Sequence, residues 1–135
     1  MIDKRKFYVD GNWVNPILKK DFEIINPSNE QPYAIISLGS KKDVDLAVSA
    51  AKKAFITWSQ VDKKEKICLL ENLMKIYQNR WDEITQTMSE EMGAPLDWSS
   101  SAQTASGADH INDFILRLKN FEFETKFNKD SNNYI

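Results

Sequence analysis

Apolar residues recur at helical spacing from about residue 44 to residue 118, and this pattern limits the folds open to the chain. Residues three or four positions apart share one face of an α-helix, so each apolar stripe must be buried against another element. The pattern predicts one helix after Ser40, a second after Asp62, a third over about residues 80–92 and a fourth over about residues 97–121. The four stripes comprise Val44, Ala47, Val48, Ala51 and Phe55; Ile67, Leu70, Met74 and Tyr77; Trp81, Ile84, Met88 and Met92; and Ala105, Ala108, Ile111, Ile115 and Leu118.

The first two predicted helices begin at residues that favour helix starts. Ser40 is followed three positions later by Asp43, and Asp62 by Glu65. Both pairs have the capping-box spacing, in which two side chains satisfy backbone N–H groups at a helix N-terminus. The sequence therefore places helix N-termini at residues 40 and 62.

Two glycines have a positional meaning in the helical part of the chain. Gly93 suits the residue just after a helix, because glycine readily adopts the left-handed conformation needed there, and a proline two positions later prevents continuation. Gly107 lies inside the fourth predicted helix, where glycine costs about 1 kcal/mol relative to alanine. We interpret it as the mark of a close contact between helices.

The first forty residues predict short β-strands. Asp10-Gly11 suits a two-residue hairpin turn, because both central positions of that turn need positive φ angles. Asn26-Pro27 ends a later strand, because proline lacks the backbone donor that strand pairing requires. The expected strands comprise residues 6–9, 12–14, 22–25 and 33–38.

These elements predict an α/β chain, or α+β as a fragment, with short strands and a hairpin followed by about four helices. Three or four short strands cannot cover four amphipathic helices, so we expect some apolar surface to face a sheet that these residues do not contain. We interpret residues 1–135 as one partial unit. Residues 126–135 are polar and rich in asparagine, and we expect a loop or a frayed tail there.

Composition excludes several classes of function. The net charge is −2 and the basic residues are dispersed, so no nucleic-acid interface is indicated. The apolar runs are only a few residues long, too short to span a membrane, and no signal-peptide pattern follows Met1. The single cysteine excludes an internal disulfide and favours a reducing compartment. We therefore expect a cytoplasmic protein that binds neither nucleic acid nor membrane.

The residues that usually carry catalysis lack the neighbours they would need. Cys68, the only thiol, lies among leucines in a predicted helix with no activating group nearby, so we interpret it as structural. His110, the only histidine, has no recognisable partner for a nucleophilic site, and one Cys with one His excludes a conventional zinc site. The four glycines cannot form a phosphate-binding loop. The sequence therefore predicts no catalytic and no cofactor-binding residue in this chain.

Five short sequence motifs nevertheless occur in a distinctive order and spacing along the chain. They are Asp10-Gly11-Asn12-Trp13-Val14, Asn26-Pro27-Ser28, the alanine-rich run from Asp43 to Phe55, Trp58-Ser59, and Glu91-Met92-Gly93-Ala94-Pro95. In this order they resemble the N-terminal segment of the aldehyde dehydrogenase family. The resemblance covers about residues 7–123.

The resemblance implies the first part of a Rossmann-like cofactor-binding domain. It also implies that full-length relatives form homo-oligomers and oxidise an aldehyde to a carboxylic acid with NAD or NADP through a cysteine thiohemiacetal. The family's nucleophilic cysteine, oxyanion-hole asparagine and water-activating glutamate match no residue here. We therefore expect this chain alone to be inactive, to bind no NAD, and to meet an aldehyde only when the missing region completes it. A truncated gene, an incomplete reading frame, one part of a split enzyme and a non-catalytic helical interaction module remain open alternatives.

Two candidate sites follow from the resemblance alone. It implies a weak structural site for a monovalent cation at the backbone oxygen of Ile25 and the carboxylate of Glu91, and oxygen ligands suit such a hard cation. Glu90 and Glu91 would otherwise face the negative end of a helix, and simple solvation of both is the alternative. It also implies that Ala102 and Ser106 line part of the aldehyde tunnel, with ordinary helix packing as the alternative.

Overall fold

Strands occupy the first part of the chain and helices the remainder, as the sequence predicts. The computed structural model describes residues 1–124, so the predicted tail at residues 126–135 lies outside the described residues. The elements are β1 (Ile2–Lys4), β2 (Phe7–Val9), β3 (Asn12–Val14), β4 (Asp21–Asn26), β5 (Gln31–Ser37), α1 (Lys41–Trp58), α2 (Lys63–Asn79), α3 (Trp81–Met92), α4 (Leu96–Trp98), the π-helix η1 (Ser99–Thr104) and α5 (Ala105–Asn120).

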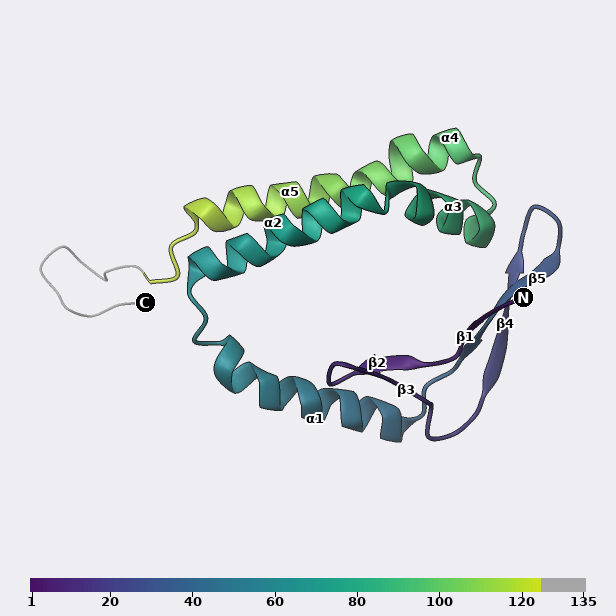
Figure 1. Cartoon of the computed structure of the whole chain (residues 1–135), viewed down its shortest axis with the longest axis horizontal. Helices are drawn as coiled ribbons and strands as arrows, with labels where there is room; N and C mark the ends of the chain where they lie inside the picture. The colour runs from purple at the N-terminus through teal and green to yellow at the C-terminus, as the bar shows by residue number, and fades with distance from the viewer. Residues whose placement is uncertain (125–135) are drawn as a thin grey trace, which may run out of the picture.

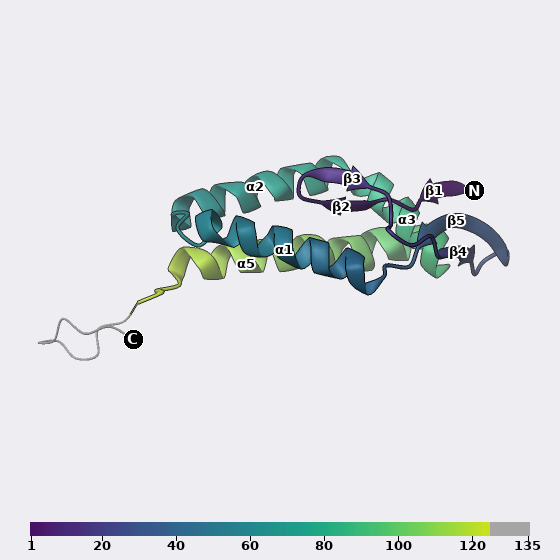
Figure 2. The ribbon, with the colours of Figure 1, turned by 90° about the horizontal axis from the view of Figure 1, so that it is seen from below.

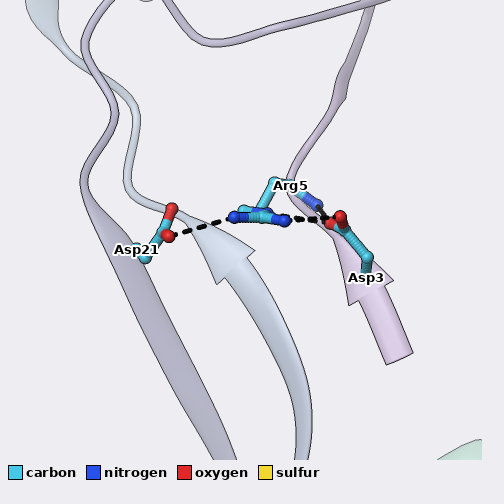
Figure 3. Close-up of polar contacts among 3 residues, drawn as sticks. All are labelled: Asp3, Arg5 and Asp21. Carbon is cyan, nitrogen blue, oxygen red and sulfur yellow. Dashed lines mark hydrogen bonds and ion pairs between the residues drawn. The ribbon is translucent and has the colours of Figure 1, made fainter. Parts of the chain in front are cut away.

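Strands β1, β5 and β4 form one sheet in that order. Strand β4 pairs with β5 in antiparallel fashion, whereas β1 pairs with β5 in parallel. The guanidinium of Arg5, just after β1, lies between two carboxylates and contacts Asp3 at 2.7 Å and Asp21 of β4 at 3.2 Å (Figure 3). This pairing lowers the pKa of Asp3 to about 2, chiefly through its hydrogen bonds with Arg5. The three side chains remain exposed to solvent, so the ion pairs orient β1 more than they stabilise it.

The predicted hairpin is confirmed in strands β2 and β3. Asp10 and Gly11 both have positive φ angles, 50° and 76°, as a two-residue turn of this kind requires. The hairpin contacts the start of α1, where a Cβ atom at Gly39 would lie 3.6 Å from the ring of Phe7. The hairpin is thereby attached to the first helix.

The capping box predicted at residue 40 is also confirmed. The buried carboxylate of Asp43 accepts hydrogen bonds from the backbone N–H of Ser40 at 2.8 Å and of Ile17 at 2.9 Å. The Ser40 hydroxyl, which also donates to this carboxylate, and these two backbone donors lower the pKa of Asp43 below its ordinary value. One side chain therefore starts α1 and also fixes the loop that follows the hairpin.

Helices α2 and α5 lie side by side and pack against each other (Figure 1). Met74 of α2 and Ala108 and Ile115 of α5 are buried at this contact face. Tyr77 occupies the space that a side chain at residue 107 would need, so the close contact predicted for Gly107 is confirmed. An exposed ion pair between Lys119 and Glu71, 2.8 Å apart, also links the two helices.

The fourth predicted helix does not form as one continuous α-helix. The chain is helical from Leu96 to Asn120, but residues 99–104 adopt π-helical hydrogen bonding between α4 and α5. The prediction of a single α-helix over residues 97–121 is therefore wrong in the middle of this segment. Apolar periodicity could not reveal the change, because the residues in the π-turn are mainly serine, glutamine and threonine.

The molecule has an open arrangement. Helix α1 and the β2–β3 hairpin lie on one side and helices α2 to α5 on the other, with the three-stranded sheet at one end (Figures 1 and 2). Within residues 1–124, only Ala34, Met74, Ala108 and Ile115 are buried apolar residues. The apolar stripe of α1 is exposed along its length, with Val44 at 57% and Phe55 at 64% exposure. The expectation that much of the apolar helix surface lacks a covering sheet is confirmed.

The exposed apolar residues do not form a membrane-spanning segment. Charged residues interrupt every long helix. Across residues 1–124, no helix has both the length and the apolar character that crossing a bilayer requires.

This arrangement predicts that the isolated chain is marginally stable and self-associates. Each exposed large apolar side chain forgoes roughly 1.5–3 kcal/mol that burial would supply, against a total domain stability of about 5–15 kcal/mol. Phe55→Ala should leave the free energy of unfolding unchanged and weaken self-association, whereas Ile115→Ala should cost about 2–5 kcal/mol because it removes a buried side chain. Sedimentation and urea unfolding measure the two effects. A monomeric wild-type chain with a sharp melt at high temperature would contradict the prediction.

Candidate functional site

Two of the sequence motifs, Asn26-Pro27-Ser28 and residues 91–95, meet where β4 ends. Asn26 is buried, and its side-chain amide donates a hydrogen bond to the carboxylate of Glu90 near the end of α3. Its side-chain oxygen accepts from the backbone N–H of Ser28 at 2.8 Å, and its backbone oxygen accepts from Glu30 at 2.8 Å. Asn26 thus organises its own turn and connects that turn to Glu90 of α3, 64 residues later in the sequence.

Gly93 completes this junction from the helical side. It follows α3 with a φ angle of 71°, so the predicted helix end is confirmed. A Cβ atom at this position would lie 2.7 Å from Cγ of Pro27, which is too close for any side chain. The hydroxyl of Ser89 donates to the backbone oxygen of Ala94 at 2.7 Å and fixes the chain as it leaves the helix. The junction therefore requires glycine both for its backbone conformation and for space.

The residues expected to hold a cation lie beside this junction. Ile25 precedes Asn26 in β4, next to an irregularity in the strand pairing between Ile24 and Ile25. The carboxylate that reaches Asn26 belongs to Glu90, while Glu91 is exposed. The sequence drew attention to both glutamates but not to the role of Glu90, which depends on a partner far along the chain. No cluster of three or more His, Cys, Asp or Glu residues suited to a metal occurs in the described part of the chain.

The two residues expected to line an aldehyde tunnel lie on either side of the change from π-helix to α-helix. Ala102 belongs to η1 and is half-buried, whereas Ser106 belongs to α5 and is exposed. The π-turn lies between α4 and α5, so the two residues lie in segments with different helical hydrogen bonding. The structure brings both to one helical segment but leaves them with different surroundings.

The thiol and the imidazole that the sequence singled out do not form a nucleophilic site. Cys68 is exposed on α2, and its nearest polar partner is the side-chain amide of Asn72 at 3.9 Å. His110 is exposed on α5, a different helix. In residues 1–124 neither side chain has the neighbours that would make a catalytic pair.

The helix N-termini offer little to a nucleotide. At α1 the carboxylate of Asp43 occupies the position that a phosphate would take, and at α2 the side chain of Asp62 accepts from the backbone N–H of Lys64 at 2.7 Å. Helix α3 carries Asp82 and Glu83 in its first turn, which repel an anion. The N-termini of α1 and α2 are thus already capped by the chain's own carboxylates.

Comparison with known proteins identifies the family to which this fold belongs. A sequence model described as the aldehyde dehydrogenase family matches residues 13–135. The chain belongs to the aldehyde dehydrogenase family. The match includes four of the five sequence motifs in full and Trp13-Val14 of the first one, so the resemblance inferred from sequence is confirmed.

Individual relatives place the chain within a longer protein family. It is 40% identical over 125 residues to a 3-succinoylsemialdehyde-pyridine dehydrogenase from a Pseudomonas species, an alignment that covers 92% of this chain and 26% of that enzyme. The chain therefore spans about a quarter of the length of the curated relatives that it matches. Its 135 residues correspond to the N-terminal segment of an aldehyde dehydrogenase.

Solved structures confirm the fold. An aldehyde dehydrogenase from Bartonella henselae superposes with a TM-score of 0.94 at 42% identity, covering 98% of this chain and 28% of that one. A mutant aldehyde dehydrogenase from Pseudomonas syringae, solved with NAD+ and octanal, superposes with a TM-score of 0.89 at 31% identity over 92% of this chain and 26% of that one. The open α/β arrangement of strands and helices is thus the one that these residues have within the family fold.

The junction between Pro27 and Gly93 yields a prediction about stability. Gly93→Ala forces a left-handed conformation on alanine and brings its Cβ atom against Pro27, so we expect a loss of about 1–3 kcal/mol in the free energy of unfolding. Gly39→Ala is the matched control, because its nearest neighbour would be at an ordinary contact distance of 3.6 Å. Urea unfolding at low protein concentration, followed by circular dichroism, compares the two variants. Equal stabilities would show that the junction is not specific for glycine.

Proposed function

We propose that this chain supplies the first part of the cofactor-binding domain of an NAD(P)-dependent aldehyde dehydrogenase. The complete enzyme oxidises an aldehyde to a carboxylic acid. The observation that carries the proposal is the superposition of 98% of this chain on the Bartonella henselae enzyme, with a TM-score of 0.94 at 42% sequence identity. The named substrate of the Pseudomonas relative and the octanal bound to the Pseudomonas syringae enzyme are both aldehydes, which supports this substrate class.

The contribution of these residues to that activity is structural. Capping of α1 and α2 by Asp43 and Asp62 supports the proposal that the described residues alone do not hold NAD. The bond-forming groups must come from the region of the family that these residues do not match. We therefore derive no catalytic step within this chain.

The uncovered helix faces are the surfaces by which the remainder of the enzyme completes the domain. The stripe of α1, with Val44, Val48 and Phe55 all exposed, has the width and period of a helix face that packs on a sheet. In relatives nearly four times as long, chain beyond this segment is present to cover such faces. This explains why a well-defined fold can leave so much apolar surface exposed.

The two sites implied by the resemblance belong to the same proposal. We propose that Ile25, through its backbone oxygen, and Glu91, through its carboxylate, contribute to a weak structural site for a monovalent cation. Their positions beside the Asn26–Glu90 contact and the exposure of Glu91 support this assignment. We likewise propose that Ala102 and Ser106 contribute to the wall of the aldehyde tunnel.

The setting of the completed enzyme follows from the same reasoning. We propose a homo-oligomer in the cytoplasm. The family resemblance supports the oligomer, and the single exposed cysteine suits a reducing compartment. Its partners would be its own subunits and its aldehyde and nucleotide substrates.

The isolated chain should not bind NAD. The reason is that its helix N-termini are capped by its own carboxylates and it has no glycine-rich loop. Calorimetric titration of the 135-residue chain with NAD at millimolar concentration measures this directly. Saturable binding would show that a nucleotide site exists within this segment.

A hybrid enzyme should be active. The hybrid carries this full chain in place of the corresponding 28% of the Bartonella henselae enzyme, and the similarity of the two folds predicts that the new interface forms. We expect NAD-dependent aldehyde oxidation within about tenfold of the parent enzyme, because packing differences at a preserved interface cost on the order of 1–2 kcal/mol. NADH absorbance measures the rate, and the remaining 72% of the parent expressed alone is the control. A folded hybrid without activity would refute the proposed function.

A further inference from the structure

The π-turn between α4 and α5 is held by a row of polar side chains from the preceding helices. Ser99 and Thr104, at the two ends of η1, are completely buried. The Ser99 hydroxyl bonds to the side chain of Gln103. Thr104 bonds to Tyr77 and Thr85. A π-turn is rare, and its continued presence needs interactions that an ordinary α-helix would not make.

Three residues spaced four apart supply these interactions. The hydroxyl of Tyr77 in α2 donates to the backbone oxygen of Thr104 at 3.0 Å. The indole N–H of Trp81, at the start of α3, donates to the hydroxyl of Ser100 at 2.8 Å. The hydroxyl of Thr85, in α3, forms a buried hydrogen bond of 2.9 Å with the hydroxyl of Thr104. The row continues across the break between α2 and α3, where the rings of Tyr77 and Trp81 meet edge to face at 6.2 Å.

Gly107 lets this row approach the helix. A Cβ atom there would overlap with the hydroxyl of Tyr77, so any larger residue would push the phenol away from Thr104. Glycine at this position lowers the intrinsic stability of α5, but it allows the contact with Tyr77 that holds the π-turn.

The π-turn determines how the two parts of this helical segment are rotated relative to each other. A π-turn holds one residue more than an α-turn, and one residue corresponds to about 100° of rotation about the helix axis. Conversion of η1 to α-helix would therefore turn the side that contains α4 and Ala102 away from its present orientation relative to Ser106 and α5.

We infer that Tyr77, Trp81 and Thr85 are positioning residues that set the shape of the aldehyde-facing wall by holding the π-turn. This inference rests on the proposed function, which assigns Ala102 and Ser106 to that wall. None of the three acts on the aldehyde itself. Their hydrogen bonds keep residues 99–104 in the π-helical conformation that orients Ala102 and Ser106 toward the aldehyde. In this way they determine which chain lengths of aldehyde the completed enzyme accepts.

The test uses the active hybrid enzyme that carries the full chain. Tyr77→Phe and Thr85→Val each remove one hydroxyl while keeping nearly the same shape. Thr85→Ser keeps the hydroxyl, and Tyr8→Phe removes one from an exposed tyrosine of β2, so these two are the controls. The readouts are amide exchange over residues 99–108 and the kcat and KM for propanal, for octanal and for NAD.

We expect Tyr77→Phe and Thr85→Val to speed amide exchange over residues 99–108 and to change the octanal-to-propanal ratio of kcat/KM by about tenfold, through KM for the aldehydes. KM for NAD should stay within about twofold of the parent hybrid, because a wall for aldehyde does not contact the nucleotide. Both controls should resemble the parent hybrid in every readout.

Two results would overturn the inference, and they differ from failure of the proposed function. An active hybrid in which both variants leave the aldehyde ratio unchanged would refute the positioning role, even if the melting temperature falls. Unchanged exchange over residues 99–108 in both variants would show that the row does not hold the π-turn. A parent hybrid that folds without oxidising any aldehyde would refute the proposed function, and with it the wall on which the inference depends.

Discussion

The contact between the Asn26-Pro27 turn and the end of α3 holds the sheet against the helical half of the molecule. Asn26 is bonded to Glu90, and Pro27 fills the space that a side chain at Gly93 would need. Helix α3 in turn packs on η1, and η1 continues into α5, which packs on α2. The position of the whole helical half relative to the sheet therefore depends on a few polar and steric contacts around one glycine. Helix α1 is attached by its contact with the β2–β3 hairpin and by the bond between Asp43 and the backbone N–H of Ile17.

This dependence follows from how little apolar surface the segment buries for itself. Hydrophobic burial is the main favourable term in folding, yet the described residues bury only four apolar side chains, most of them in α2 and α5. The stripe of α1 is exposed, although its spacing is that of a buried helix face. The family match resolves this contrast, because relatives with nearly four times as many residues contain further chain to pack there. The segment has the geometry of a domain whose stabilising core lies largely outside these residues.

Features determined by neighbouring residues could be predicted from the sequence, and features determined by distant partners could not. The hairpin turn at Asp10-Gly11, the cap at Ser40 and the helix end at Gly93 each follow from the conformational preferences of adjacent residues, and all three are confirmed. Strand β1 was missed because three residues carry no alternation, and its strand form depends on pairing with β5. The pairing of Glu90 with Asn26 was missed for the same reason, although both residues were singled out separately. The cation and tunnel residues came from family resemblance, and nothing in their local sequence could have assigned those roles.

The buried side chains show how such a segment keeps a definite shape. In residues 1–124, six buried residues are polar or charged and four are apolar. Hydrogen bonds depend on direction and burial of apolar surface does not, so buried polar groups specify geometry while contributing modest net stability. Asn26, Asp43 and Thr104 each bond to partners from more than one part of the chain. In this segment the polar contacts therefore fix the relative positions of the elements. The exposed apolar faces bury little surface within the described residues, which is why we expect the isolated chain to be only marginally stable.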